Sequence, residues 1–348
     1  MSGRVGGVSV AMATLNGARH LPEQLLSLTG QTRLPRELVA CDDGSSDQTL
    51  QVLGTFAADA PFPVRIVRNP RRLGYAENFL AAAALCSGDL VAFCDQDDYW
   101  LATKLEVCEA EARRTGAGIV AHSGAVADDG LRPSGRLVPR ARRRRVVPPE
   151  RSDPWWDWWG YAMVFRRRLL EVAETDQRVE SQFLPGRAPL DHDDWIAFLG
   201  CVLAPIAFVP EALVLHRRHA TTTTQTVAHV GKVRASRERG DEWHHARYGD
   251  LARMAVERAR FWRRTAMRLS GREHDLAVRA AVRFDRFAAA YGARQTIYAG
   301  GPRMARTRTV AAMLVSGAYR RRANGGVGVG ALAKDAYVTA RPSSATRA

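Results

Sequence analysis

The sequence predicts an α/β fold: a mainly parallel sheet with flanking helices, followed by a helical extension at the C-terminus. In the first 125 residues, short apolar segments typical of strands alternate with segments of helical period, which favours a parallel sheet covered on both faces. Beyond residue 226 the chain is rich in Arg and Ala and keeps a helical period. Polar clusters follow the apolar segments, and ligands of such sheets bind at the carboxyl ends of the strands.

The elements of the first part follow from residue spacing. Val8, Val10 and Met12 alternate as in a strand, whereas Leu21 and Leu25 have helical spacing. We expect strands at 8–12, 38–41, 64–67 and 90–94, and helices at 21–28, 50–57 and 75–86.

Further along the chain the pattern is less regular. Pro, Gly and Arg dominate 128–154, which predicts a loop. The apolar run 199–215 is interrupted by Pro205 and Pro210, and we interpret it as two buried strands rather than a membrane span. The chain has three predicted parts: 1–125, 126–226 and a basic helical region at 227–348.

The composition is that of a soluble globular protein, with 46% hydrophobic and 25% charged residues among 348. This excludes collagen-like, mucin-like and wholly disordered chains. The formal net charge of +15 favours a polyanionic partner such as a nucleotide, a nucleic acid or an acidic membrane surface. Five Cys without a CxxC pair indicate free buried thiols, and the first residues lack the apolar stretch of a signal peptide. The cytoplasm is therefore the expected location.

Three carboxylates, Asp95, Asp97 and Asp98, lie within four positions after an apolar strand. Like charges so close repel one another, and a divalent cation such as Mg²⁺ or Mn²⁺, which prefers oxygen ligands, would compensate them. The alternative is an acidic loop in which Asp98 only caps the following helix.

A second acidic pair, Asp42 and Asp43, also follows a strand and precedes Gly44. A carboxylate here is able to accept the ring N3–H of uracil or thymine. The alternative is an Asx turn at the start of the next helix, since Asp-Gly loops commonly form such turns.

The segment 191–194 reads Asp-His-Asp-Asp and leads into apolar residues. A carboxylate among apolar and acidic neighbours tends to a raised pKa, which suits a general base that takes a proton from a hydroxyl. The alternative is a helix N-terminus whose acids complement the helix dipole.

Basic and aromatic clusters complete the candidate site. The segment 216–219 follows a strand, and its His and Arg side chains are suited to a diphosphate; a solvated basic turn is the alternative. The His pairs 216/219 and 244/245 lack a tetrahedral ligand set, so zinc is not expected. Five aromatic residues within 155–161 exceed what one buried face needs, so part of them is expected to stack on sugar rings.

The order of these motifs resembles that of family 2 glycosyltransferases, which have the Rossmann-like GT-A fold. The similar segments are the opening strand (8–16), the nucleoside-binding signature (31–47), an Asn-Gly-Asn segment (69–78), the DxD strand with its helix (87–106) and an acceptor-side Gly segment (160–166). Segments 192–195 and 215–219 resemble the H-D-x-W and L-Y-R-x-H elements of a rhamnosyltransferase-like branch, with His216 in place of Tyr. The resemblance covers roughly residues 6 to 222.

The resemblance implies an inverting glycosyltransferase of the hexosyltransferase type. Residues 1–125 would form its nucleotide-sugar-binding half and residues 126–226 its acceptor-binding and catalytic half. It would move a sugar from a UDP- or dTDP-sugar to a hydroxyl of a glycan or lipid-linked acceptor, in the synthesis of cell-envelope polysaccharide or glycoconjugate. Mg²⁺ or Mn²⁺ on Asp95 and Asp97 would neutralise the departing diphosphate. Asp193 would be the base, with the neighbouring Asp194 left open. The expected nucleotide-binding residues are Thr14, Asn16, Asp42, Asp43, Asn78, Asp95, His216, Arg217 and His219. The expected acceptor-binding residues are Trp158, Trp159, Gly160, Asp194 and Trp195.

Two other functions compete with this one. A sugar-phosphate nucleotidyltransferase also uses Mg²⁺, but it would carry a Gly-rich basic loop after the first strand, which 16–20 does not supply. A non-enzymatic polyanion-binding protein would explain the net charge, but not three acidic clusters at one sheet edge. No nucleic acid is expected as a partner.

The basic C-terminal third predicts a peripheral position on the inner face of the cell membrane. The Arg-rich segment 253–268, with Phe261 and Trp262, is expected to lie on an anionic membrane surface. The alternative is a solvated helical cap.

Overall fold

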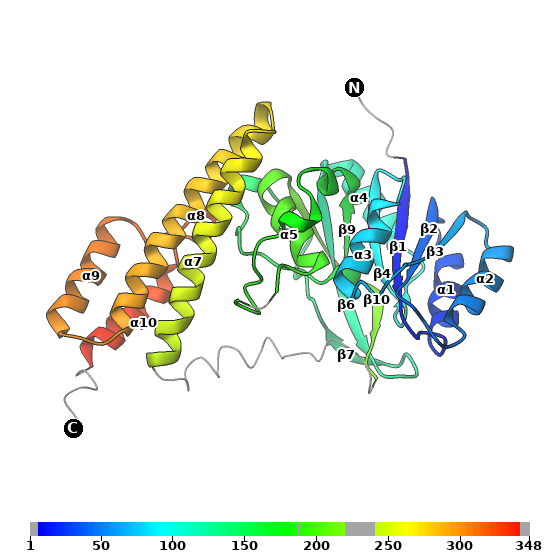
Figure 1. Ribbon diagram of the computed structural model, residues 1–348, viewed down its shortest axis with the longest axis horizontal. Coiled ribbons are helices and arrows are strands. Elements are labelled where there is room, and N and C mark those ends of the chain that lie inside the picture. Colours follow the sequence, from blue (N-terminus) through cyan, green and yellow to red (C-terminus); the bar gives the residue numbers. More distant parts are fainter. Residues whose placement is uncertain (1–5, 187, 220–240, 342–348) are drawn as a thin grey trace. The chain divides into compact units, whose positions relative to one another are not determined.

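The computed structural model describes residues 6–186, 188–219 and 241–341. The chain divides into two compact units: Met1–Arg178 with Asp191–Thr222, and Val179–Leu190 with Thr223–Ala348. The first unit contains the sheet and the second contains the long C-terminal helices (Figure 1). In the part of the chain that the structure describes, no helix combines the length and the hydropathy needed to cross a membrane.

The first unit is built on one ten-stranded sheet with the order β3-β2-β1-β4-β9-β6-β10-β5, in which β7 pairs with β6 and β8 with β10. The strands are β1 (Val8–Thr14), β2 (Glu37–Asp42), β3 (Val64–Arg68), β4 (Leu90–Asp95), β5 (Tyr99–Trp100), β6 (Ile119–Ala127), β7 (Pro133–Leu137), β8 (Arg145–Val147), β9 (Met163–Arg166) and β10 (Ile206–Arg217). Strands β3, β2, β1 and β4 are mutually parallel, as are β6 and β10, whereas β9 joins the two groups by antiparallel pairing. The carboxyl ends of β1, β2 and β4 therefore lie at one edge of the sheet.

Helices cover both faces of this sheet, as the sequence predicts. They are α1 (Leu21–Thr29), α2 (Thr49–Asp59), α3 (Tyr75–Ala84), α4 (Lys104–Thr115) and α5 (His192–Leu203), with short 3₁₀ helices at Pro149–Arg151, Gly160–Ala162, Arg167–Glu171 and Thr175–Gln177. On one face, Met12 packs in a cluster with Leu28 of α1 and Leu105 of α4. On the other, Phe93 of β4 meets Phe79 of α3 edge to face, because successive strand residues point to opposite faces.

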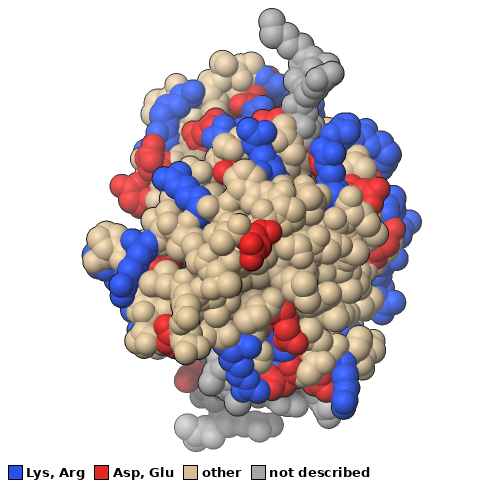
Figure 2. Space-filling model, turned by 90° about the vertical axis from the view of Figure 1, so that its right-hand side faces the viewer, with Lys and Arg blue, Asp and Glu red and all other residues tan. Residues whose placement is uncertain are grey.

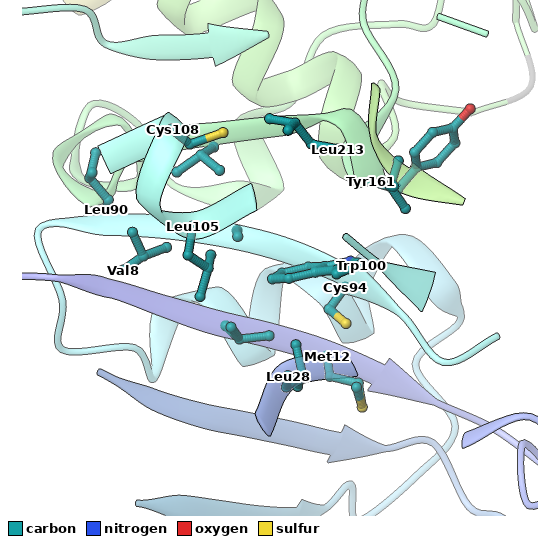
Figure 3. Packing of buried hydrophobic residues seen from close by; sticks show 14 of the residues in the cluster. Val8, Met12, Leu28, Leu90, Cys94, Trp100, Leu105, Cys108, Tyr161 and Leu213 are labelled. Carbon is teal, nitrogen blue, oxygen red and sulfur yellow. The ribbon is translucent and has the colours of Figure 1, made fainter. Parts of the chain in front are cut away.

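The core cluster surrounds Trp100, which Figure 3 shows beside Cys94 and above Met12 and Leu28. All five Cys are buried and free, which confirms the prediction of free buried thiols. Burial raises the pKa of the Cys108 thiol to about 12, so this thiol stays protonated at neutral pH.

Two predictions about the second half of this unit are wrong. The run 199–215 is not two strands: α5 continues to Leu203 and only β10 follows. Helix α5 is buried on nearly every side, so its sequence lacks the polar face that marks a helix. The expected loop at 128–154 contains β7 and β8, whose five and three residues are too few for a visible alternation.

A groove of about 520 Å³ lies between α1 and α2, and Leu25, Leu26, Val52 and Phe56 are among its lining residues. Figure 2 looks onto the end of the first unit at which Figure 1 places these helices, and few charged side chains occupy its centre.

The second unit is helical, as predicted, with α7 (Asp241–Ala266), α8 (Gly271–Tyr298), α9 (Arg303–Val315), a 3₁₀ turn (Arg322–Asn324) and α10 (Val329–Ala340). Its buried polar centre is Asp335, whose Oδ1 accepts hydrogen bonds from Arg294 and Tyr298 and whose Oδ2 accepts one from Tyr319. Phe261 and Trp262 are 1% and 0% exposed. The prediction that they lie on a membrane surface is therefore wrong.

Candidate active site

The polar clusters that follow β1, β2 and β4 lie side by side at the carboxyl edge of the sheet. Thr14 at the end of β1 pairs in register with Asp42 of β2, and Ala13 pairs with Asp95 of β4. Gln96 connects the β4 loop to the β1 loop, because its side-chain amide exchanges hydrogen bonds with the backbone of Leu15 at 2.9 and 3.0 Å.

Asp42 is fully buried, and its carboxylate is engaged by the protein at both oxygens. Oδ1 accepts from the hydroxyls of Thr14 and Ser45, while Oδ2 accepts from the backbone N–H of Gly44 at 3.1 Å and of Ser45 at 2.9 Å. These four hydrogen bonds fill the acceptor positions of a carboxylate. Asp42 thus forms the turn that the sequence left as an alternative, with Gly44 at a φ of 90°.

Asp43 retains acceptor capacity that Asp42 lacks. Its Oδ1 accepts from Asn69 Nδ2 at 3.0 Å and from Leu73 N at 2.6 Å, while its Oδ2 accepts from Gly74 N at 2.8 Å. Burial works to raise the pKa of Asp43, but the hydrogen bonds from Leu73, Asn69 and Gly74 outweigh it and hold that pKa below its usual value. Asp43 is therefore an anion with one acceptor position left on Oδ2.

The expected nucleotide-binding residues Asn16 and Asn78 are engaged with neighbouring loops. Asn78 donates to Cys41 O at 2.9 Å and accepts from Asn69 Nδ2 at 2.8 Å, so it supports the loop that holds Asp43. Asn16, at a φ of 48°, accepts from Ser46 N at 2.9 Å. Asn69 is not among the site residues predicted from the sequence, although it begins the Asn-Gly-Asn segment and directly follows β3 at the same edge.

The acidic cluster after β4 is tied to the end of β10. Asp97 Oδ2 accepts from His219 Nε2 at 2.8 Å, and Asp98 Oδ1 accepts from His216 Nδ1 at 2.9 Å. Burial, followed by the charges of Asp98 and Asp97, raises the pKa of Asp95. Burial and the charge of Asp98 likewise raise the pKa of Asp97.

Arg217 is 2% exposed, and its hydrogen bonds stabilise the acidic loop after β4. Its backbone N–H donates to Asp98, and its guanidinium donates to Asp97 O at 2.7 Å, to Asp129 O and to the carboxylate of Glu23. A contact between Arg217 and a diphosphate would require some of these bonds to be exchanged.

Asp193 lies in the first turn of α5, and a short series of contacts connects it to the acidic cluster. Its Oδ2 accepts from Gly160 N at 2.9 Å. The next residue, Tyr161, stacks on His216 with ring centroids 4.3 Å apart, and His216 is the partner of Asp98. The charge of Asp193 also contributes to the raised pKa of Asp95. These contacts bring the start of α5 close to the acids after β4.

Glycine is required at position 160 because α5 lies against it. A Cβ there would meet His192 Nε2 at 2.9 Å and Asp193 Cβ at 3.3 Å. Asp193 Oδ1 accepts from Asp194 N at 2.9 Å, so both of its oxygens are oriented by backbone donors. In this segment burial raises the pKa of Asp191, the residue that precedes the helix.

The predicted acceptor-binding Trp residues differ in their exposure. Trp159 is half-buried, with its ring 5.6 Å from that of Tyr161 and 6.1 Å from that of His216. Trp158 is also half-buried and donates to His122 O and Ala162 O. Trp195 is fully buried against Phe198, so its side chain is not part of a surface for the acceptor.

The carboxylate oxygens after β4 are ligands of the kind that a hard divalent cation prefers. Asp95 and Asp97 supply oxygen ligands whose raised pKa values reflect burial and mutual repulsion, which a bound cation would relieve. Within the described ranges, no group of three or more His, Cys, Asp or Glu side chains is arranged to hold a metal ion. A cation here would therefore take its other ligands from water or phosphate, as Mg²⁺ usually does.

This sheet with its helices is the GT-A fold. Residues 9–172 match the model of glycosyl transferase family 2, and the chain carries a domain of this family. The glycosyltransferase interpretation is thereby confirmed; the rhamnosyltransferase-like branch stays a prediction.

Solved structures and curated relatives agree with this. Staphylococcus aureus TarS 1–349 has a TM-score of 0.52 at 16% identity, covering 88% of this chain and 82% of that chain. The complex of the same protein with UDP-GlcNAc has a TM-score of 0.54 at 16% identity, over 88% and 83% of the two chains. At this identity the likeness shows the fold.

The relatives match over shorter segments. An uncharacterized glycosyltransferase of Nostoc is 33% identical over 99 residues, 28% of this chain and 30% of the relative. UDP-Glc:alpha-D-GlcNAc-diphosphoundecaprenol beta-1,3-glucosyltransferase of Escherichia coli is 33% identical over 100 residues, 29% of this chain and 38% of the relative. The matched segments thus span well under half the length of these curated relatives.

Proposed function

We propose that the protein transfers a sugar from UDP- or dTDP-sugar to an acceptor hydroxyl, with inversion of the anomeric carbon. The series of contacts from Asp193 through Gly160 and Tyr161 to the His216–Asp98 pair carries the proposal, because it puts a carboxylate beside the acidic cluster at the sheet edge. The family match and the likeness to a fold solved with UDP-GlcNAc support it.

The pyrimidine is held by Asp43. The ring N3–H of uracil or thymine donates to Asp43 Oδ2, the oxygen that accepts only one hydrogen bond from the protein. Asp42 has no free acceptor position and instead stabilises the turn at Gly44 and Ser45. The loop 69–74 and Asn78 keep Asp43 oriented.

The diphosphate lies over the acidic cluster. Asp95 and Asp97 would hold a divalent cation, whose charge would neutralise the leaving diphosphate. His216 adds positive charge: burial alone would lower its pKa, but the Asp98 carboxylate outweighs this and raises it. Arg217 and His219 contact the diphosphate on exchange of their present acceptors.

Asp193 acts as the base. One of its oxygens takes the proton of the acceptor hydroxyl while the hydroxyl oxygen bonds to the anomeric carbon from the face opposite the diphosphate. The bond from that carbon to the diphosphate oxygen breaks, and the electron pair leaves with the diphosphate. Asp193 is favoured over Asp194 because backbone donors at Gly160 and Asp194 fix the orientation of both its oxygens.

The acceptor is a glycan or a lipid-linked glycan of the cell envelope, with Trp158 and Trp159 at the acceptor side. The E. coli relative, whose name specifies a diphosphoundecaprenol-linked sugar, supports this class. The same proposal places the protein in the cytoplasm, because its donors are nucleotide sugars and we expect these to be in the cytoplasm.

A donor screen tests the proposed function. Purified protein is incubated with UDP- and dTDP-sugars, with and without Mn²⁺, and release of the nucleoside diphosphate is measured. We expect release from at least one donor, dependent on Mn²⁺ and lost in Asp193→Asn. A protein that binds any polyanion equally, without metal dependence, would contradict the proposal.

A further inference from the structure

The positive charge of the protein is concentrated in its C-terminal helices. Residues 241–341 contain 20 Lys and Arg against eight Asp and Glu, a net charge of +12 out of +15 for the chain. The asymmetry is greatest from Arg286 to Lys334, where nine basic residues occur without a single acidic one. Helix α9 lies within this stretch.

Helix α9 buries a narrow side and exposes several large apolar side chains on the other. Arg306, Val310 and Met313 are its buried residues. Met304, Leu314 and Val315 are 69%, 51% and 91% exposed. Met304 and Val315, with exposed Ala311 between them, lie on one face of the helix because their spacing is close to whole turns.

Basic side chains lie on and beside this face, because Arg308 is four residues after Met304 and seven before Val315. Arg303 and Arg308 are exposed on α9, and Arg320 and Arg321 are exposed in the turn that follows it. The first acidic residue after Asp285 is Asp335, which is buried and hydrogen-bonded to Arg294. The exposed face of α9 thus combines apolar contact area with positive charge, the pattern of a helix that lies in a membrane interface.

We propose that α9 and the turn 316–322 form a docking surface for an anionic lipid bilayer. A soluble polyanion would satisfy the arginines but leave Met304, Leu314 and Val315 in water. A second copy of the same surface would cover the apolar residues, but it would bring the arginines of the two copies together, and their like charges repel. An anionic bilayer matches both features, since its headgroups meet the arginines and its interface takes the apolar side chains.

The surface differs from the one that the sequence suggested. There, Phe261 and Trp262 were expected to meet the lipid, and both are buried. The inference also goes beyond the proposed function, because it concerns where the protein binds and not what it transfers.

Flotation of the full-length protein tests the surface. Vesicles of phosphatidylcholine with phosphatidylglycerol are compared with vesicles of phosphatidylcholine alone. We expect the protein to float with the anionic vesicles only, and less so at high salt. The double variant Met304→Asp/Val315→Asp should lose at least about tenfold in partition, because it places two acidic groups in the interface.

A matched control on α8 distinguishes an effect of this face of α9 from a general effect of added negative charge. Val278 and Val282 are 43% and 44% exposed, and Val278→Asp/Val282→Asp adds the same charge to the same unit. This control should float like the original protein, and all three proteins should show the same circular dichroism and thermal unfolding. The proposal would be overturned if the α9 variant floated as well as the original protein, or if the α8 control lost as much flotation as the α9 variant. Binding to neutral vesicles, or a dimer that the α9 substitutions abolish, would also overturn it.

Discussion

Lys104 offers a quantitative test of the packing beneath the site. It is fully buried at the start of α4, where its Nζ donates to Tyr161 O at 2.7 Å and lies 3.6 Å from the centroid of the Trp100 ring. Burial lowers the pKa of Lys104 from 10.5 to about 8. A shift of this size corresponds to about 3 kcal/mol between the two protonation states.

The sign of the effect follows from proton linkage. Between about pH 8 and 10.5 the unfolded chain holds the proton of Lys104 and the folded chain does not, so the folded state gains stability as pH rises through this window. Below it, the cost of burying the cation is fully present. Compared with Lys104→Met, the original protein should therefore gain about 3 kcal/mol between neutral and high pH.

Urea denaturation of both proteins at about pH 7 and about pH 10.5 measures this difference. The buried Cys thiols titrate in both proteins, so their contribution largely cancels in the comparison. A difference in unfolding free energy that is the same at both pH values would refute the reasoning, because Lys104 would then hold its proton equally in both states.

Three further predictions follow from the site and the helical unit. Gly160→Ala should lower kcat by at least about tenfold and leave nucleotide affinity unchanged, because the new Cβ pushes against the start of α5 and displaces Asp193. Steady-state kinetics and UDP titration check this, and a loss confined to UDP affinity would contradict it. Asp43→Asn should weaken UDP binding, whereas Asp42→Asn should mainly destabilise the fold by about 1–3 kcal/mol, because it disturbs four buried hydrogen bonds; calorimetry and urea denaturation separate the two, and the reverse outcome would exchange their roles. Asp335→Asn should cost about 3 kcal/mol or more in urea denaturation, because it leaves a buried arginine without its counter-charge; an unchanged midpoint would refute this.

Much of the fold could be predicted from the sequence because β1 to β4 and the intervening helices keep clear periods. Helix α5 could not, since burial on nearly all sides removed its polar face. Strands β7 and β8 could not, since each pairs with only one neighbour and is too short to show a period.

For the site, the sequence located the acids but not their individual tasks. The donors that saturate Asp42 include Thr14, which lies 28 positions earlier in the chain. Those that orient Asp43 come from the loop 69–74, which is also remote in sequence. Trp195 reads like a binding residue, yet the structure buries it completely and stacks it on Phe198. Local spacing cannot show which partner a side chain meets across the fold.

The central claim is that separate acids hold the donor and activate the acceptor. One measurement tests it most directly: UDP or dTDP affinity, with and without Mn²⁺, and turnover on the best donor, for Asp97→Asn beside Asp193→Asn. The account predicts that both variants lose turnover, while only Asp97→Asn loses the Mn²⁺-dependent part of the nucleotide affinity. Full turnover in Asp193→Asn, or loss of metal-dependent affinity in that variant alone, would contradict it.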